Sequence, residues 1–156
     1  MKIEKKQKTH FKECENTTIP KILLNICDVV SYGRTDSNEF YRNWYTKPQK
    51  SFNILNNEGL IKLGYYWFDY ELSYHIIANL VCVELPKTTY NIIPFKYKPF
   101  RTALYGVKKF IKENQIQEIH TPIFGTKIIE GDWIKILKII KEVFEDSEDL
   151  VINIYE

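Results

Sequence analysis

The feature that most constrains the fold is the stretch 119–133 and the apolar helical pattern that follows it. The stretch begins as a short apolar run that reaches Pro122, which cannot donate to a strand ladder and so favours a strand end. Gly125 permits a sharp turn, and Asp132 is a favoured helix N-cap residue. Apolar residues at helical spacing over 133–144 complete the pattern. The sequence therefore predicts a strand, a glycine loop and a helix in succession.

Such a strand–loop–helix unit can point backbone N–H groups and a helix N-terminus at an anion such as phosphate. A plain connection between a strand and a helix gives the same sequence pattern, because short glycine loops are common in α/β proteins. The spacing alone favours the plain connection and leaves both interpretations open.

The chain of 156 residues has the length of one domain, and we expect a single domain over 1–156 with a weakly structured segment at 1–20. Hydrophobic residues make up 44% of the chain, enough for a substantial core. The formal net charge is only +2, which argues against a dedicated nucleic-acid-binding protein. The abundance of Ile, Lys, Asn and Tyr is typical of an AT-rich genome, such as that of a phage or a low-GC bacterium.

The three cysteines, Cys14, Cys27 and Cys82, are odd in number and widely spaced, which fits neither a disulfide framework nor a metal site. We therefore expect reduced thiols, no metal and no cofactor. No apolar run approaches the roughly 20 residues that span a bilayer, and the charged N-terminus lacks the apolar segment of a signal peptide. The sequence predicts a cytoplasmic protein without a membrane partner.

Apolar runs predict strands at 22–28, 60–68, 75–83, 118–123 and 150–155. Helical spacing predicts a helix capped by Ser37 and another over 100–112. Proline, asparagine and glycine breakers favour a long loop over 46–59. The alternation of strands and helices implies a mixed central sheet with helices on both faces, which is a three-layer α/β/α fold.

Ligands of such sheets bind beyond the carboxyl ends of the strands. Two glycine-containing loops, 28–36 and 124–132, follow apolar strands, and we expect them to form the mouth of one cleft. Asp28 stands at the first strand end, where it is either a group that positions a ribose or a water, or a capped turn residue. The residue type leaves these two roles evenly balanced.

Three segments together resemble the macro domain: Ile-Leu-Leu-Asn-Ile-Cys-Asp-Val-Val-Ser-Tyr-Gly at 22–33, Ile-Ala-Asn at 77–79, and the stretch 119–133. The similarity is greatest to the small ADP-ribose-processing enzymes, the terminal ADP-ribose glycohydrolases and ADP-ribose-1''-phosphate phosphatases. It covers about residues 12–156. The resemblance implies a macro-like α/β/α fold and a site for ADP-ribose or a related nucleotide.

The resemblance also implies which residues contact the ligand. They are Ile26, Asp28, Gly33, Arg34 and Thr35 in the first loop and Gly125, Thr126, Lys127 and Ile128 in the second. It identifies no catalytic residue beyond the candidate Asp28. Arg34 and Lys127 are either phosphate contacts or exposed loop charges.

The chain departs from the family at three loop glycines, which are Thr35, Lys127 and Glu130 here. Glycine at these positions lets the backbone approach a diphosphate, so the replacements add Cβ atoms where the family has ligand. Lys127 either contacts phosphate through its ammonium group or fills the site. The lysine and aspartate that do the chemistry in the glycohydrolases align with apolar residues near Val81 and Ile129. This argues against hydrolysis by that mechanism.

Three functions remain open, in this order. The first is binding of ADP-ribose or a related nucleotide, with hydrolysis of an ADP-ribose derivative as an extension. The second is a macro fold with a remodelled or lost pocket that acts as a non-catalytic binding protein. The third is a nucleic-acid-associated module, supported only by the aromatic residues at 65–68, which are more often core than base-stacking platforms. We therefore do not expect a nucleic-acid partner, and the sequence leaves the identity of any protein partner unknown.

Overall fold

The computed structural model describes residues 1–8, 11, 18–72, 74–84, 94–124 and 131–156. Six strands of the described residues form one mixed sheet in the order β1-β6-β5-β2-β4-β3. The pairs are parallel except β3 with β4, which are antiparallel. The strands are Lys2–Lys6 (β1), Lys21–Asp28 (β2), Tyr66–Leu72 (β3), His75–Val83 (β4), Glu118–Pro122 (β5) and Val151–Tyr155 (β6).

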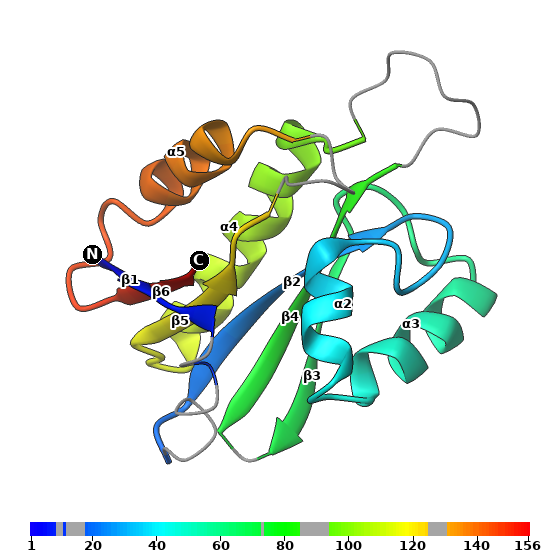
Figure 1. The fold of residues 1–156 in the computed structure, drawn as a ribbon, viewed down its shortest axis with the longest axis horizontal. Coiled ribbons are helices and arrows are strands. Elements are labelled where there is room, and N and C mark those ends of the chain that lie inside the picture. Colours follow the sequence, from blue (N-terminus) through cyan, green and yellow to red (C-terminus); the bar gives the residue numbers. More distant parts are fainter. Residues whose placement is uncertain (9–10, 12–17, 73, 85–93, 125–130) are drawn as a thin grey trace.

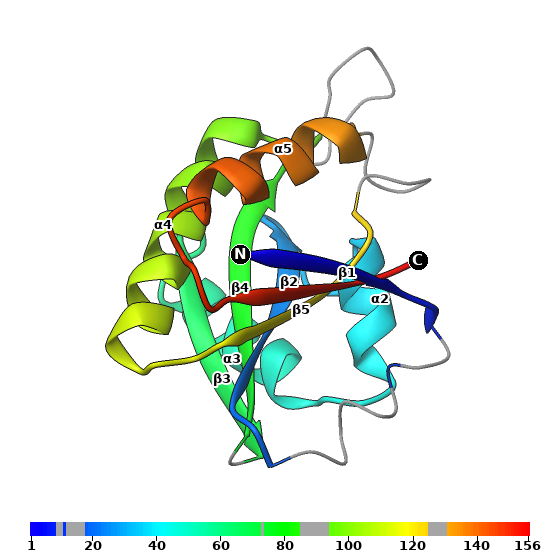
Figure 2. The same ribbon diagram turned by 90° about the vertical axis from the view of Figure 1, so that its left-hand side faces the viewer.

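Helices cover both faces of the sheet, so the predicted three-layer α/β/α fold is confirmed (Figures 1 and 2). The first two helices, α2 (Asp36–Arg42) and α3 (Lys47–Asn57), lie on one face. The last two, α4 (Tyr97–Glu113) and α5 (Trp133–Val143), lie on the other. None of these helices is long and apolar enough to cross a membrane.

The central strands β2 and β4 are buried along their whole length. Successive strand residues point to opposite faces. Ile22 and Leu24 accordingly belong to the core that β2 forms with α4 and α5. Leu23 instead belongs to a second cluster with Tyr41 of α2. Because both faces are covered, these strands are apolar on both faces and do not alternate with polar residues.

The loop predicted over 46–59 is wrong, because Lys47–Asn57 forms the helix α3. Pro48 lies in the first turn of this helix, where a missing N–H costs nothing. Gly59 follows the last turn with φ +73, which is a common way for a helix to end. The residues read as breakers therefore mark the two ends of one helix.

Two further predictions, one of weak structure and one of a strand, also need correction. Residues Lys2–Lys6 lie in the segment expected to be weakly structured, yet they form β1 and pair with β6. This edge strand contains one apolar residue, Ile3, and is held by backbone hydrogen bonds to β6, so no apolar run signals it. The strand predicted at 60–68 begins only at Tyr66 and reaches Leu72. The remaining strand predictions match β2, β4, β5 and β6 to within one residue at each end.

Candidate functional site

The candidate site begins where β2 ends, at Asp28. The Asp28 side chain is fully buried, and its Oδ1 accepts hydrogen bonds from the backbone N–H of Val30 at 2.7 Å and from the Arg34 guanidinium at 3.3 Å. The Arg34 side chain is about one-third exposed (34%). Asp28 therefore shapes the turn after β2 and orients Arg34, which is the role of a capped turn residue.

Gly33 forms the tip of this loop, with φ +97. Its N–H donates to Asn38 Oδ1 at 3.0 Å. The positive φ favours glycine, and a Cβ at this position would lie 2.1 Å from Nη2 of Arg42, so a larger residue would also displace that guanidinium. The guanidinium of Arg42 packs against Gly33, and Arg34 follows it in the chain, so two cations border the loop.

Side chains at the start of α2 fill the space beside Ile26. Among the described residues, β5 pairs with β2 at Ile22 and Leu23 only, and the backbone of Ile26 has no described strand partner on that side. Instead, its N–H donates to Ser37 Oγ at 2.7 Å, and its carbonyl accepts from Thr35 Oγ1 at 2.6 Å and Asn38 Nδ2 at 3.0 Å. Thr35, not Ser37, is the helix N-cap, since Thr35 Oγ1 accepts from the N–H of Asn38.

This arrangement changes the expected role of two site residues. The side chains of Ile26 and Thr35 are fully buried, and that of Thr35 points to the backbone of Ile26. The Cβ that replaces the family's glycine therefore lies beneath the loop. The N–H groups of Ile26, Val30 and Gly33 are all occupied by side chains of the loop and α2. An anion at this loop would consequently meet the guanidinium groups rather than these three amides.

Beneath the loop, a buried amide connects β2 to its neighbours. Asn25 donates through Nδ2 to Asn79 Oδ1 at 2.8 Å and to the Tyr32 hydroxyl at 3.2 Å. Its Oδ1 accepts from Asn38 Nδ2 at 2.8 Å and from Ser37 Oγ at 3.1 Å. Burial raises the pKa of the Tyr32 phenol above its usual value, so this hydroxyl stays protonated.

Sequence reasoning missed four contributions to this site. Ser37 hydrogen-bonds the backbone of β2, Asn38 hydrogen-bonds Gly33 and Asn25, and the Arg42 guanidinium packs against Gly33. Asp69 Oδ2 accepts from Asn79 Nδ2 at 2.8 Å. One signal was available, because Asn25 and Asn79 interrupt the two most apolar strands and prove to be paired in register. A buried amide requires a hydrogen-bonding partner, and the two asparagines are partners of one another.

Thiol chemistry finds no support at this site. Cys27 is fully buried, and burial raises the pKa of its thiol well above the usual value, which makes it a poor nucleophile. Within the described ranges, no group of three or more His, Cys, Asp or Glu side chains is placed to hold a metal ion.

The second predicted loop follows β5, which runs parallel to β2 and ends at Pro122. The carboxyl ends of the two strands therefore lie at the same edge of the sheet. Gly125, Thr126, Lys127 and Ile128 lie outside the described residues, so their ligand contacts and the shared cleft stay predictions. Beyond them, Asp132 is the N-cap of α5 as predicted, because its Oδ1 accepts from the N–H of Ile134 at 2.9 Å.

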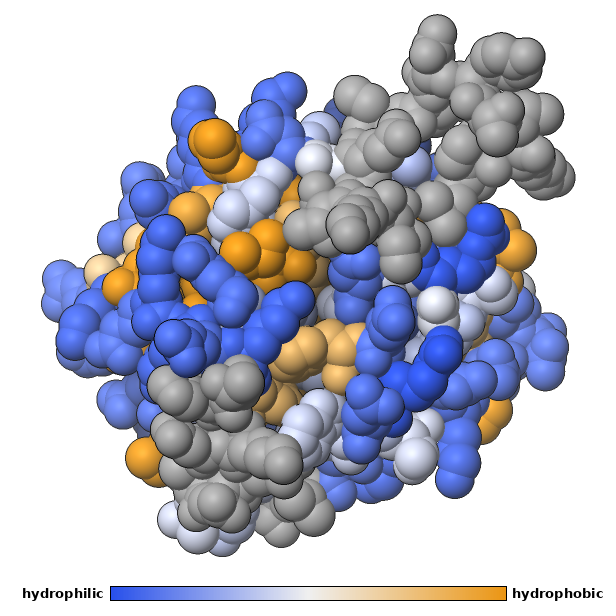
Figure 3. All heavy atoms as spheres, in the orientation of Figure 1, coloured by the Kyte–Doolittle hydropathy of each residue, from blue (hydrophilic) through white to orange (hydrophobic). Residues whose placement is uncertain are grey.

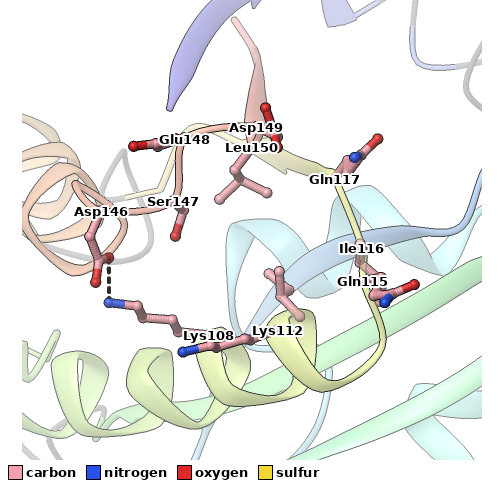
Figure 4. A pocket seen from close by; sticks show the side chains of 11 residues that line it. Lys108, Lys112, Gln115, Ile116, Gln117, Asp146, Ser147, Glu148, Asp149 and Leu150 are labelled. Carbon is pink, nitrogen blue, oxygen red and sulfur yellow. Dashed lines mark hydrogen bonds and ion pairs between the residues drawn. The ribbon is translucent and has the colours of Figure 1, made fainter.

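The described surface includes two hollows near strand ends. One of about 380 Å³ lies beside the candidate site, between α2 and the end of β5, with Asp36 and Ile123 in its lining. The other, of about 570 Å³, lies at the far edge of the sheet, between the end of α4 and the segment before β6 (Figure 4). An ion pair of Lys108 and Asp146 crosses it at 2.6 Å. Figure 3 shows a mostly hydrophilic face in which hydrophobic residues gather in small patches.

No protein-family model matches the sequence, and a comparison with curated proteins finds no match. Solved structures do match. A protein of unknown function from Bacteroides thetaiotaomicron has a TM-score of 0.82 at 20% identity, over 99% of this chain and 98% of that one. A macrodomain protein from Streptomyces coelicolor has a TM-score of 0.78 at 16% identity, over 99% of both chains.

A third match is Thermosipho africanus DarTG, solved in complex with ADP-ribose. It has a TM-score of 0.66 at 9% identity and covers 86% of this chain and 38% of that one. At such low identities, these similarities establish the fold alone. The chain has the three-layer fold of the macrodomain proteins.

Proposed function

We propose that this chain binds ADP-ribose or a related nucleotide at the sheet edge where β2 and β5 end. The macrodomain fold supports this proposal, and the Thermosipho africanus protein, of which this chain covers 38%, was solved in complex with ADP-ribose. The observation that carries it is the position of two guanidinium groups at the loop after β2, that of Arg42 against Gly33 and that of Arg34 beside Asp28. Guanidinium groups suit a diphosphate because they make paired, charge-assisted hydrogen bonds.

The loop geometry favours binding without turnover over hydrolysis. Asp28 is the candidate catalytic residue, but its Oδ1 already accepts from Val30 and Arg34, so it holds the loop and the cation. The occupied N–H groups of Ile26, Val30 and Gly33 indicate a remodelled pocket relative to one built on glycine amides. These contacts favour a protein that binds the nucleotide without catalysis. Hydrolysis of an ADP-ribose derivative is the alternative function.

We expect ADP-ribose to raise the stability of the wild-type chain by roughly 2.7 kcal/mol at about 100 times its Kd. Replacing Arg34 by alanine should weaken binding by about ten- to a hundredfold, since a hydrogen bond to a charged group contributes about 1.5–3 kcal/mol. Calorimetry with ADP-ribose, ADP-ribose-1''-phosphate and NAD measures both effects and ranks the ligands. Product analysis after incubation reports any turnover.

The matched control is Arg101→Ala, which removes a guanidinium of similar exposure on α4 that pairs with Glu142. Its affinity for ADP-ribose should equal that of the wild type. Wild-type protein that binds none of the three ligands would overturn the proposal. Equal losses in the Arg34 and Arg101 variants would show that net charge, rather than this loop, determines binding.

Lys127, outside the described residues, separates the proposal from a lost pocket. If its ammonium group contacts the diphosphate, Lys127→Ala should weaken ADP-ribose binding by roughly ten- to a hundredfold. If it blocks the site, the wild type should not bind, and Lys127→Gly, which restores the family's residue, should create affinity. Titration of the wild type and both variants distinguishes these results by their opposite signs. Unchanged affinity in both variants would exclude both roles of Lys127, phosphate contact and blockage of the site.

A further inference from the structure

A chain of side-chain amides connects the loop tip to the edge strand β3. Gly33 N–H donates to Asn38 Oδ1 at 3.0 Å, and Asn38 Nδ2 donates to Asn25 Oδ1 at 2.8 Å. Asn25 Nδ2 donates to Asn79 Oδ1 at 2.8 Å, and Asn79 Nδ2 donates to Asp69 Oδ2 at 2.8 Å. Four hydrogen bonds thus run in one direction, from a backbone amide to a carboxylate.

The chain crosses four elements of the fold. Asn38 belongs to α2, Asn25 to β2, Asn79 to β4 and Asp69 to β3. The three asparagines are fully buried, so the two hydrogen bonds between them are made away from bulk water, whereas the two end bonds, from Gly33 and to Asp69, are partly buried. Hydrogen bonds in such surroundings strengthen one another, and an unmet partner there is costly.

The direction of the chain is determined by its two ends. A side-chain amide can be turned either way round, with its oxygen and its nitrogen exchanged. A backbone N–H can only donate, and an ionised carboxylate can only accept. Gly33 and Asp69 therefore select the same orientation for every asparagine between them. Turning any one amide over would bring two donors or two acceptors together.

We propose that Asp69 is a positioning residue for the candidate binding loop, acting on Gly33 through Asn79, Asn25 and Asn38. The carboxylate is the charged acceptor at the end of the chain, and it holds Asn79 in the orientation that the other amides require. At the opposite end, the N–H of Gly33 is held with φ +97.

The guanidinium groups depend on that geometry. The Arg42 guanidinium packs against Gly33, and Arg34 is the next residue along the chain. A substitution of Asp69 should therefore shift the guanidinium groups of Arg34 and Arg42, which are proposed to bind the diphosphate. This effect on ligand affinity rests on the proposed function, whereas the effect on Gly33 does not.

Asp69 also anchors α3, which provides a matched control. Its Oδ2 accepts from Ser51 Oγ of α3 at 2.8 Å and from Trp67 Nε1 at 3.2 Å. Ser51→Ala removes a hydrogen bond to the same carboxylate but leaves the chain of amides complete. Asp69→Ala removes the terminal acceptor. Asp69→Asn keeps one acceptor oxygen without the charge.

The test measures hydrogen exchange of the Gly33 amide by NMR, and ADP-ribose affinity by calorimetry. Exchange at Gly33 should be about tenfold faster in Asp69→Ala, about threefold faster in Asp69→Asn and unchanged in Ser51→Ala. Affinity should fall in the same order, by about tenfold in Asp69→Ala. If Asp69→Ala fails to fold, the comparison of Asp69→Asn with Ser51→Ala still tests whether Asp69 positions Gly33.

An exchange of the two side chains tests the direction of the chain. Asn79→Asp alone brings two carboxylates together and should disturb Gly33 at least as much as Asp69→Ala. The double variant Asn79→Asp with Asp69→Asn moves the carboxylate from position 69 to position 79. There it can still accept a hydrogen bond from Asn25. The double variant should return Gly33 exchange to within about threefold of the wild type.

Two results would overturn the proposal. One is Gly33 exchange in the Asp69 variants that equals that of Ser51→Ala. The other is a double variant that is no closer to the wild type than Asn79→Asp alone. If the wild type binds no ADP-ribose, the proposed function fails, but the exchange of Gly33 still decides the role of Asp69.

Discussion

Replacing Asn25 by leucine should lower the free energy of unfolding by about 3–5 kcal/mol. Asn25 is fully buried, and its amide group makes hydrogen bonds with Asn79, Asn38, Ser37 and Tyr32. Leucine is close to asparagine in size, so the loss comes from buried polar groups left without this partner rather than from a cavity. Each such group costs about 1–3 kcal/mol.

Urea unfolding followed by circular dichroism measures this loss. Asn53→Leu is the control, because Asn53 lies exposed on α3 and the same change there should stay within about 0.5 kcal/mol of the wild type. A loss below about 1 kcal/mol in Asn25→Leu would mean that its neighbours find other partners. The network would then contribute little to the free energy of unfolding.

The elements that the sequence predicted well are those with strong local signals. The runs 22–28 and 75–83 are apolar on both faces, and they form the buried central strands β2 and β4. The helix after Asp132 combined an N-cap with an apolar stripe, and it forms α5. These signals agree with the tertiary environment, so a local pattern was sufficient.

The errors occur where tertiary contacts decide. β1 contains a single apolar residue, and its hydrogen bonds to β6 join segments from opposite ends of the chain. The segment 46–59 contains residues that break helices in the interior, but α3 places them at its ends. In both cases, composition gave the wrong prediction because the position of a residue within the element determines its effect.

The candidate site shows the same division. The strand end at Asp28 and the glycine turn at Gly33 were predictable from an apolar run followed by a polar loop. That Thr35 is buried beneath the loop was not, because this depends on the hydrogen bond from Thr35 Oγ1 to the carbonyl of Ile26, which forms only in the folded chain. The link from Asn25 to Asp69 joins three strands and is visible only in the folded chain.

Lowering the pH from 7.5 to 4.5 should destabilise the fold by about 2–3 kcal/mol through His120 alone. This histidine is buried in β5, where its Nδ1 lies 2.7 Å from the Tyr155 hydroxyl and its Nε2 lies 2.9 Å from Glu118. Burial lowers the pKa of His120 from 6.5 to about 4. The Glu118 carboxylate opposes this shift, while the charges of Lys21 and Lys6 add to it.

The sign follows from proton binding. Between about pH 4 and 6.5, the unfolded chain protonates this histidine and the native chain does not, so stability falls as the pH falls through that window. Urea unfolding of the wild type and of His120→Gln at pH 7.5 and 4.5 isolates the effect, because glutamine can still hydrogen-bond but does not titrate. The wild type should lose about 2–3 kcal/mol more than the variant. Equal losses in both proteins would show that His120 is protonated in the native state at pH 4.5, with Glu118 as its counter-charge.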